Sequence, residues 1–270
     1  MSSVPQSDCT PRDSRGRLMQ QLLLQLGRWE AAAAEDATVF SSGAAAIDRL
    51  LPGGGLRHGM LVEWLSAQGG GAATLSLLAA REACREGGAL VVIDRRQIFY
   101  PQAAAAWGID LDRLIVVRPR SARDELWAAV QSLRSPAVAA VWGMIDRLDS
   151  PAFRRVQLAA QAGRTLGLLL RPPSARGQPS WADVRLGVSP LSVVRSPLRS
   201  YHGLRTMDHG RYQHVRLLRC RSGRPDGSAT LEIDDTAYAV RDVSSNHDTH
   251  PLPMVAELAD PADRSFPARA

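Results

Sequence analysis

Short apolar runs alternate with amphipathic stretches through the middle of the chain. The runs are of the length and type that form buried strands, and they lie at 60–66, 89–94, 113–119, 137–145 and 165–172. Apolar residues at helical spacing fill the intervals, and they predict helices at 72–87, 101–109, 122–135 and 150–164. This alternation is typical of a parallel sheet with helices on both faces.

Three of these helices carry signals for their ends. Gly87 and Gly88 predict the end of the first helix, because glycine commonly follows the last helical residue. The helix at 122–135 places Leu126, Val130 and Leu133 on one stripe. In the last helix, Ser150 is the expected N-cap and Pro151 the first helical position.

The pattern differs on either side of this alternating region. Residues 38–59 predict a short strand, a turn, a small helix at 44–51 and a glycine turn. From about residue 181, short strand-like runs follow one another, and 214–221 and 230–241 predict an antiparallel hairpin. We therefore expect an α/β core over 38–243 with a small antiparallel C-terminal part.

The two ends of the chain are expected to lie outside this core. Residues 1–16 are polar and 244–270 lack periodicity, so both are predicted to be disordered. Residues 17–35 predict a helix that carries Leu18, Leu22, Leu26 and Trp29 near a 3.6-residue period. Packing of this helix on its own domain and docking on a partner are equally compatible with the pattern.

Composition places the chain among ordinary globular proteins. Of its 270 residues, 45% are hydrophobic and 22% are charged, which suits one good core. Cys9, Cys84 and Cys220 stand singly, which fits a reducing compartment and argues against a disulfide scaffold or a structural zinc site. Without a signal core or a run long enough to span a membrane, we expect a soluble cytoplasmic protein.

Every basic residue of the chain is arginine. The formal net charge is +6, which suits an acidic partner such as DNA or an acidic protein segment, and equally a solvated basic surface. Because the sequence contains no lysine, no lysine-dependent catalysis or phosphate binding is available to it.

A glycine-rich turn between a predicted strand and a predicted helix has the components of a phosphate-binding loop. In the G-x-x-x-x-G-K-[ST] frame, alanines stand at the lysine and hydroxyl positions, and Thr74 lies one place further on. The degenerate loop consists of Ser66, Gly69, Gly70, Gly71, Ala72 and Ala73. We predict that this loop supports no useful catalysis. Whether a nucleotide binds stays open, with a plain turn slightly favoured.

Residues 38–242 resemble a RecA-type core in order and spacing. Residues 38–64 are similar to its entry, including the Val62–Glu63 pair, and 87–119 resemble the segment around its second core strand. The resemblance implies that the acid activating the attacking water would lie two residues after Asp94. Arg96 stands there.

The other landmarks that the resemblance implies are also replaced. Trp142 and Gly143 occupy the end of the strand that should carry a metal-coordinating aspartate, and Asp146 lies further on. Arg171 and two prolines stand where an amide should sense the γ-phosphate. The long DNA-binding loop is reduced to 174–180.

This pattern of loss is similar to the ImuA family, the RecA-like proteins of bacterial mutagenesis cassettes that are often grouped with SulA-like proteins. The resemblance implies a catalytically inactive, cofactor-free accessory protein in DNA-damage-induced (SOS) translesion synthesis. Its implied partners are an ImuB-like Y-family polymerase homologue, RecA, an error-prone replicative-type polymerase and DNA. The resemblance also implies that helix 17–35 packs on a neighbour, as in RecA filaments, so self-association is a further expectation.

Two alternatives stand beside this interpretation. The first is a SulA-like inhibitor of cell division that binds the tubulin-like division GTPase, although such inhibitors tend to be shorter. The second is an ATP-dependent recombinase, which the absence of lysine disfavours.

The most basic stretch, 195–224, has a composition compatible with DNA binding or with a solvated or protein-docking surface. The candidate DNA-binding residues are Arg176, Arg199, Arg205 and Arg211. No metal site is predicted, because His202, His209, His214 and Asp208 match no known ligand spacing. Core packing is expected for five tryptophans: Trp64, Trp107, Trp127, Trp142 and Trp181.

Overall fold

A computed structural model describes residues 38–67, 69–191, 210–221 and 227–243. The predicted helix 17–35 and the segment 244–270 lie outside the described residues. None of the helices in the described part is both long and apolar enough to cross a bilayer.

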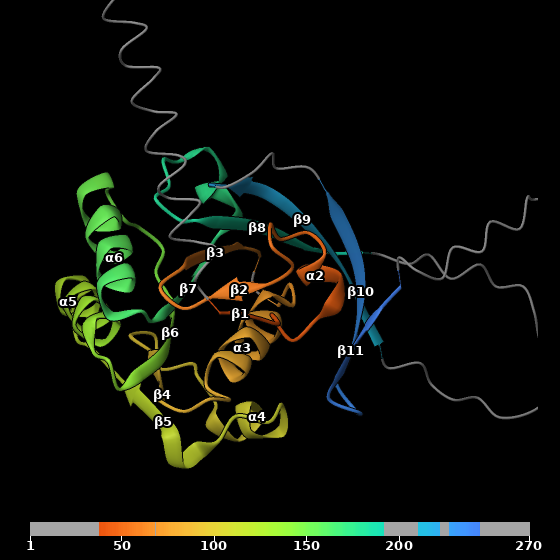
Figure 1. The fold of residues 1–270 in the computed structure, drawn as a ribbon, viewed down its shortest axis with the longest axis horizontal. Coiled ribbons are helices and arrows are strands. Elements are labelled where there is room, and N and C mark those ends of the chain that lie inside the picture. The colour runs from red at the N-terminus through yellow and green to blue at the C-terminus, as the bar shows by residue number, and fades with distance from the viewer. Residues whose placement is uncertain (1–37, 68, 192–209, 222–226, 244–270) are drawn as a thin grey trace, which may run out of the picture.

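One sheet organises the described residues (Figure 1), in the strand order β11-β10-β9-β8-β3-β7-β6-β4-β5. Its strands are β3 (Leu61–Leu65), β4 (Ala89–Ile93), β5 (Leu114–Val117), β6 (Val138–Met144), β7 (Leu166–Arg171), β8 (Val184–Pro190), β9 (Gly210–Cys220), β10 (Ser228–Asp234) and β11 (Ala239–Asp242). From β8 to β5 all pairs are parallel, and β9, β10 and β11 add antiparallel strands. The predicted α/β class is confirmed, while the antiparallel strands extend the same sheet instead of forming a separate part.

Five helices accompany the sheet in the described part. They are α2 (Ala45–Asp48), α3 (Ala72–Ala83), α4 (Pro101–Ala106), α5 (Ala122–Arg134) and α6 (Ser150–Gly163). The 3-10 turns η1 (Leu111–Arg113) and η2 (Pro173–Gly177), and a separate strand pair of β1 (Val39–Phe40) and β2 (Leu56–Arg57), complete the described elements. Figure 1 places α5 and α6 together on one side of the sheet and α2, α3 and α4 on the other.

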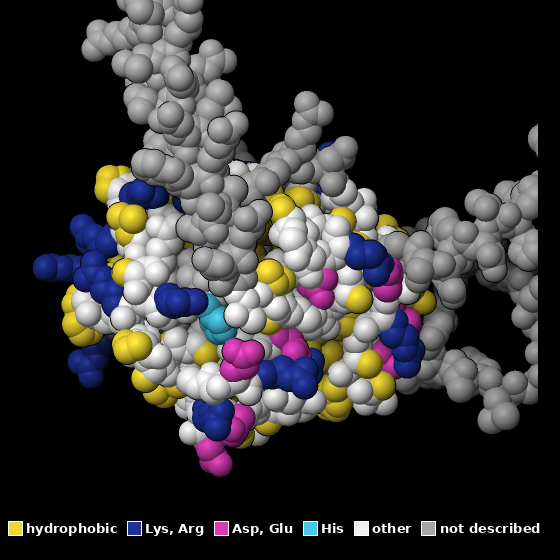
Figure 2. Space-filling model, viewed as in Figure 1, with side chains coloured by type: hydrophobic (Ala, Val, Ile, Leu, Met, Phe, Trp, Pro, Cys, Tyr) yellow, Lys and Arg dark blue, Asp and Glu magenta, His cyan; other side chains and the backbone are white. Residues whose placement is uncertain are grey.

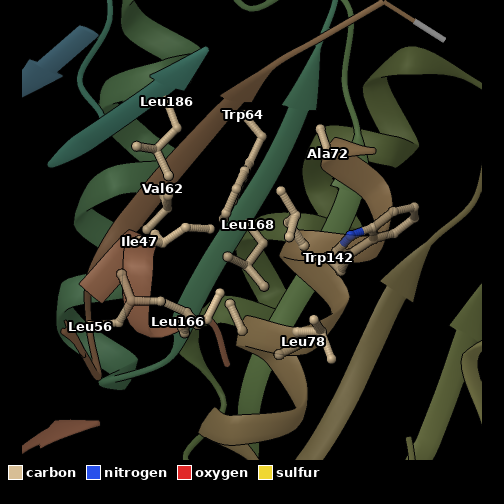
Figure 3. Close-up of a cluster of buried hydrophobic side chains, with 14 of the residues drawn as sticks. Ile47, Leu56, Val62, Trp64, Ala72, Leu78, Trp142, Leu166, Leu168 and Leu186 are labelled. Carbon is tan, nitrogen blue, oxygen red and sulfur yellow. The ribbon is translucent and has the colours of Figure 1, made fainter. Parts of the chain in front are cut away.

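Each face of the sheet has its own hydrophobic core, because side chains alternate between the two faces along a strand. On β3, Val62 and Trp64 face α2 and α3, whereas Leu61 belongs to the cluster under α5 and α6. Figure 3 shows the first cluster, in which strand side chains meet Ile47 of α2 and Leu78 of α3. Burial on both faces explains why the central strands read as continuous apolar runs.

Two predicted helix ends are wrong in detail. The N-cap of α6 is Asp149 and not Ser150, because the Asp149 carboxylate accepts the Ala152 N–H at 2.8 Å. Helix α3 ends at Ala83 and not at Gly87, because the following amides return to carbonyls three residues back, as in the Gly87 N–H to Cys84 bond of 3.1 Å.

Two of the five tryptophans do not belong to the core. Trp64, Trp107 and Trp142 are buried, but Trp127 is 65% exposed and Trp181 is 38% exposed. Trp127 lies on the outer stripe of α5, while Leu133 of the same helix is buried. The prediction that Trp127 is buried rested on residue type and was wrong, because residue type does not show which face of a helix is covered.

Candidate functional site

A cavity of about 330 Å³ lies where β3, β6 and β7 end and α3 begins. Because these strands are parallel, the segments that follow them meet at one edge of the sheet, the usual place for a ligand in an open α/β fold. Its walls include the degenerate loop, Arg96, Asp146 and apolar side chains such as Ile98 and Met144. The loop singled out in the sequence therefore lines a cavity, and the chemistry there depends on the orientation of these side chains.

The glycines of the loop are required by its geometry. Gly69 and Gly71 have φ of 77° and 78°, a region that favours glycine. A Cβ on Gly70 would lie 2.1 Å from the Ser66 Oγ. That hydroxyl donates to the carbonyls of Ala67 and Gly70, at 3.0 and 3.3 Å. Ser66 thus stabilises the loop through hydrogen bonds to the backbone of the loop itself.

The start of α3 carries no side chain that could hold a triphosphate as a lysine does. Gly71 is the N-cap, without a side-chain capping bond, and Ala72 and Ala73 form the first turn. Gln213 of β9 packs against Gly71, since a Cβ there would lie 2.8 Å from the Gln213 Cδ. Thr74 lines the cavity one residue beyond the expected hydroxyl position.

Arg96 reaches across the cavity mouth. Its guanidinium forms an ion pair with the carboxylate of Asp146, which follows β6. Asp146 is the only carboxylate among the described residues that line the cavity, and a cation already binds it. Arg96 therefore stands where an acid is expected after β4, and it also forms an ion pair with Asp146.

Asp94, by contrast, has a structural role. Its carboxylate is nearly buried and accepts the N–H groups of Ile98 and Phe99, at 3.0 and 3.2 Å. Arg118 lies 3.7 Å from it. Asp94 thereby fixes the turn that carries Arg96.

The end of β6 presents hydrophobic groups where a metal ligand would lie. The indole N–H of Trp142 donates to the Ser76 hydroxyl of α3 at 2.8 Å, and its ring lies 5.6 Å from that of Phe99. Figure 3 shows Trp142 beside α3. The next inward residue, Met144, lines the cavity. A thioether is a poor ligand for Mg²⁺, which prefers oxygen.

Arg171, at the end of β7, points its guanidinium away from the cavity. That group is fully buried, lies over the Phe153 ring at 5.5 Å, and donates to Glu63 at 2.7 Å. Arg185 binds the other Glu63 oxygen at 2.6 Å, and the Ser180 hydroxyl donates to the same carboxylate at 2.7 Å. We call Glu63, Arg171, Ser180 and Arg185 the Glu63 cluster.

Sequence reasoning missed this cluster. The available signal was a single charged residue in each of three apolar runs, at 60–66, 165–172 and 184–188. Buried charges are retained where they are paired, so three such residues on neighbouring strands point to one another. β3 lies between β7 and β8, which brings them together.

Two of the four predicted DNA-binding residues, Arg176 and Arg211, lie in the described part of the chain. Arg211 lines the cavity and forms a two-point ion pair with Asp235, at 2.6 and 2.8 Å. Arg176 lies in η2, beside a second cavity of about 330 Å³ that His214 and Arg216 also line. Arg199 and Arg205, and the partner-binding candidates Leu18, Leu22, Leu26 and Trp29, lie outside the described residues. Within the described part, no group of three potential metal ligands is found.

The cavity residues do not fit Mg²⁺ and a nucleoside triphosphate. Ala72 and Ala73 stand at the positions of the lysine and the hydroxyl residue, and the carboxylate of Asp146 is bound by Arg96. At the ends of β6 and β7, Met144 and the inward-turned Arg171 replace the expected oxygen ligand and amide. The cavity therefore lacks the side chains that such a ligand would need.

Comparison with known proteins agrees with this architecture. The family model of the RecA N-terminal domain matches residues 17–150. Protein ImuA of Caulobacter vibrioides is 29% identical over 235 residues, which span 82% of this chain and 91% of that protein. The chain is therefore similar to the RecA-like ImuA family over most of its length.

The chain is also similar to RecA proteins and, in structure, to a recombinase. Protein RecA of Mesomycoplasma hyopneumoniae is 29% identical over 198 residues, covering 60% of this chain and 59% of that protein. The crystal structure of the RadB recombinase superposes with a TM-score of 0.56 at 16% identity, over 75% of this chain and 99% of that one. The latter likeness supports the fold alone.

One cysteine of the chain offers a simple chemical test of the structure. Burial raises the pKa of the Cys84 thiol to about 11. At pH 8 we therefore expect Cys84 to react with iodoacetamide about 100-fold more slowly than a thiol with its ordinary pKa near 9, because the thiolate is the reactive form. Mass spectrometry of timed digests measures the rate, with an unstructured cysteine peptide as the reference. Equal rates would contradict the burial of this thiol.

Proposed function

We propose that the chain is an accessory protein of DNA-damage-induced mutagenesis that acts by docking to other proteins and does not hydrolyse ATP. The family relationship to ImuA supports the first part. The observation that carries the second part is the Arg96–Asp146 ion pair, which uses the single carboxylate of the described cavity wall to bind a cation of the same chain.

The electrostatics of the cavity support this proposal. Catalysis of phosphoryl transfer depends on cations and metal ions that neutralise charge on the transferred group. Arg96 and Arg211 each bind a carboxylate, and Arg171 binds the buried Glu63. All three arginines that line the cavity therefore have acidic partners, and each would have to give one up to serve a phosphate.

A steady-state assay tests the absence of turnover. Purified full-length protein, mixed with MgATP and with or without single-stranded DNA, is expected to release phosphate no faster than a blank, and a RecA sample serves as the positive control. Arg96→Glu restores an acid at that position and is still expected to be inactive, because the loop alanines remain. Turnover at rates typical of RecA would overturn the proposal.

The docking part needs a cellular and a biochemical readout. Deletion of the gene is expected to lower damage-induced mutation frequency, and complementation with the Arg96→Glu variant is expected to restore it. Tagged protein should co-purify with a Y-family polymerase homologue. Co-purification with the division GTPase in its place, together with filamentous cells, would favour the SulA-like alternative.

A further inference from the structure

The outer surface of α5 and α6 combines exposed apolar and basic side chains. We call it the α5–α6 surface. It consists of Arg123, Trp127 and Arg134 of α5, and Arg155, Leu158 and the following Arg164 of α6. The cavity residues described above do not include any of these six.

The two helices are held at a fixed register. They connect successive parallel strands, so they run in the same direction along one face of the sheet. Their last turns touch, since a Cβ on Gly163 would lie 2.0 Å from the Leu133 carbonyl oxygen. Trp127 lies six residues before Leu133, and Leu158 lies five before Gly163. At 1.5 Å per residue, Trp127 and Leu158 are therefore at about the same height.

This arrangement gives the surface an apolar centre. Trp127 is 65% exposed and Leu158 is 46% exposed. Both helices bury their other apolar side chains, such as Val130 and Val156, against the sheet. A large aromatic side chain left open to water, level with an exposed leucine on the neighbouring helix, is the kind of feature that marks a protein contact.

Arginines lie toward both ends of this centre. Arg123 and Arg155 are near the start of the two helices, and Arg134 and Arg164 are at their ends. All four are exposed, and no ion pair or hydrogen bond of their side chains is found among the described residues. Elsewhere, exposed arginines such as Arg85 and Arg211 do have acidic partners.

The few acids near this surface do not neutralise it. The carboxylate of Asp124 accepts from the Ser121 hydroxyl at 2.7 Å. Glu125 is buried and bound by Arg95 at 2.9 Å, and Asp149 caps α6. Figure 2 shows blue basic and yellow hydrophobic side chains together over α5 and α6, at the left of the view. The surface is thus cationic around an apolar centre.

We propose that the α5–α6 surface binds an acidic, amphipathic helical segment of a protein partner. Apolar side chains of that segment would cover Trp127 and Leu158, and its carboxylates would meet the four arginines, because complementary charge fixes orientation and register. A nucleic acid fits less well, since its phosphates would leave the apolar centre uncovered. The inference rests on the proposed docking function and names the surface that serves it.

Fluorescence anisotropy on the full-length protein tests this surface. The probe is a labelled amphipathic peptide with leucines along one helical face and glutamates beside them. Saturable binding is expected, and Trp127→Ala is expected to weaken it about tenfold or more, as for an aromatic residue central to an interface. The double variant Arg123→Gln/Arg155→Gln should also weaken binding and reduce its dependence on salt.

Matched controls separate recognition from general charge effects. Arg85→Gln removes an exposed arginine that follows α3, on the opposite face of the sheet, and is expected to leave peptide binding unchanged. A second peptide, with glutamines in place of the glutamates, is expected to bind more weakly. Equal affinity of the two peptides, or unchanged binding by Trp127→Ala, would overturn the proposal.

Other occupants give distinct results. Binding of a labelled single-stranded oligonucleotide that Trp127→Ala abolishes, without peptide binding, would assign the surface to nucleic acid and overturn the proposal. Slow thiol labelling of a Trp127→Cys variant would mean that another segment of this chain covers the surface. A Trp127-dependent dimer in sedimentation would assign the surface to a second copy of the chain. Either result would overturn the proposal. The proposed function fails separately, through ATP turnover or an unchanged mutation frequency.

Discussion

Glu63→Ala is expected to destabilise the protein by about 3–5 kcal/mol, because it leaves buried cations without their counter-charge. Glu63 is fully buried and accepts hydrogen bonds from Arg171, Arg185 and Ser180. Without it, the guanidinium of Arg171, which has no exposed side-chain surface, keeps only the Gln178 side chain and a backbone carbonyl as acceptors. Urea unfolding followed by circular dichroism measures the effect.

Two comparisons show whether the loss arises from unpaired buried charge. Asp235→Asn removes an exposed partner of Arg211 and is expected to cost about 0.2–1 kcal/mol. The triple variant Glu63→Met/Arg171→Met/Arg185→Met removes the whole charged set, and is expected to be more stable than Glu63→Ala. A loss below about 1 kcal/mol for Glu63→Ala would contradict the assigned burial of the cluster.

The second large effect is expected from Trp142→Ala, at about 3–5 kcal/mol. Trp142 is 3% exposed, and its truncation creates a cavity beneath α3 and removes the indole N–H that donates to the Ser76 hydroxyl. Trp142→Phe retains most of the packing and removes the hydrogen bond, so a loss of about 1 kcal/mol is expected. Thermal unfolding followed by circular dichroism measures both variants.

Trp127→Ala is the matched control for this substitution. The same residue type is removed, but Trp127 is 65% exposed, so the expected change lies within about 0.5 kcal/mol. Similar losses at the two positions would mean that one of them is wrongly placed. The control also establishes that a binding defect of Trp127→Ala arises in a folded protein.

Each large effect concerns a buried group that contains a residue at a position where the RecA resemblance implies nucleotide chemistry. Trp142 occupies the strand end where a metal ligand is expected, and Arg171 follows β7, where an amide is expected. Each is now part of a packed or paired buried group. These residues are therefore expected to contribute to the stability of the fold.

Much of this architecture could be predicted from the local pattern. The alternation of apolar runs and helical stretches predicted the parallel strands and the helices, because strand and helix periods differ. The position of the cavity also followed, since segments after parallel strands meet at one edge. Ala72 and Ala73 were recognised as replacements from the loop motif and Arg96 from the resemblance to a RecA-type core, and all three line the cavity.

Pairings between distant residues could not be predicted in this way. Arg96 and Asp146 are 50 positions apart, and Arg185 lies 122 positions from Glu63. Such contacts depend on which strands are neighbours, and the local pattern does not give the strand order. β8 lies beside β3 in the sheet although more than a hundred residues separate them in the chain.

Arg96, two residues after Asp94, illustrates what the sequence determines and what only the tertiary structure determines. Its place after a buried strand, and the absence of lysine from the loop, are properties of the sequence. Its bond to Asp146, the inward turn of Arg171 and the exposure of Trp127 are properties of the folded chain. Periodicity states which residues share a face, whereas long-range packing settles which face is covered and which charges meet.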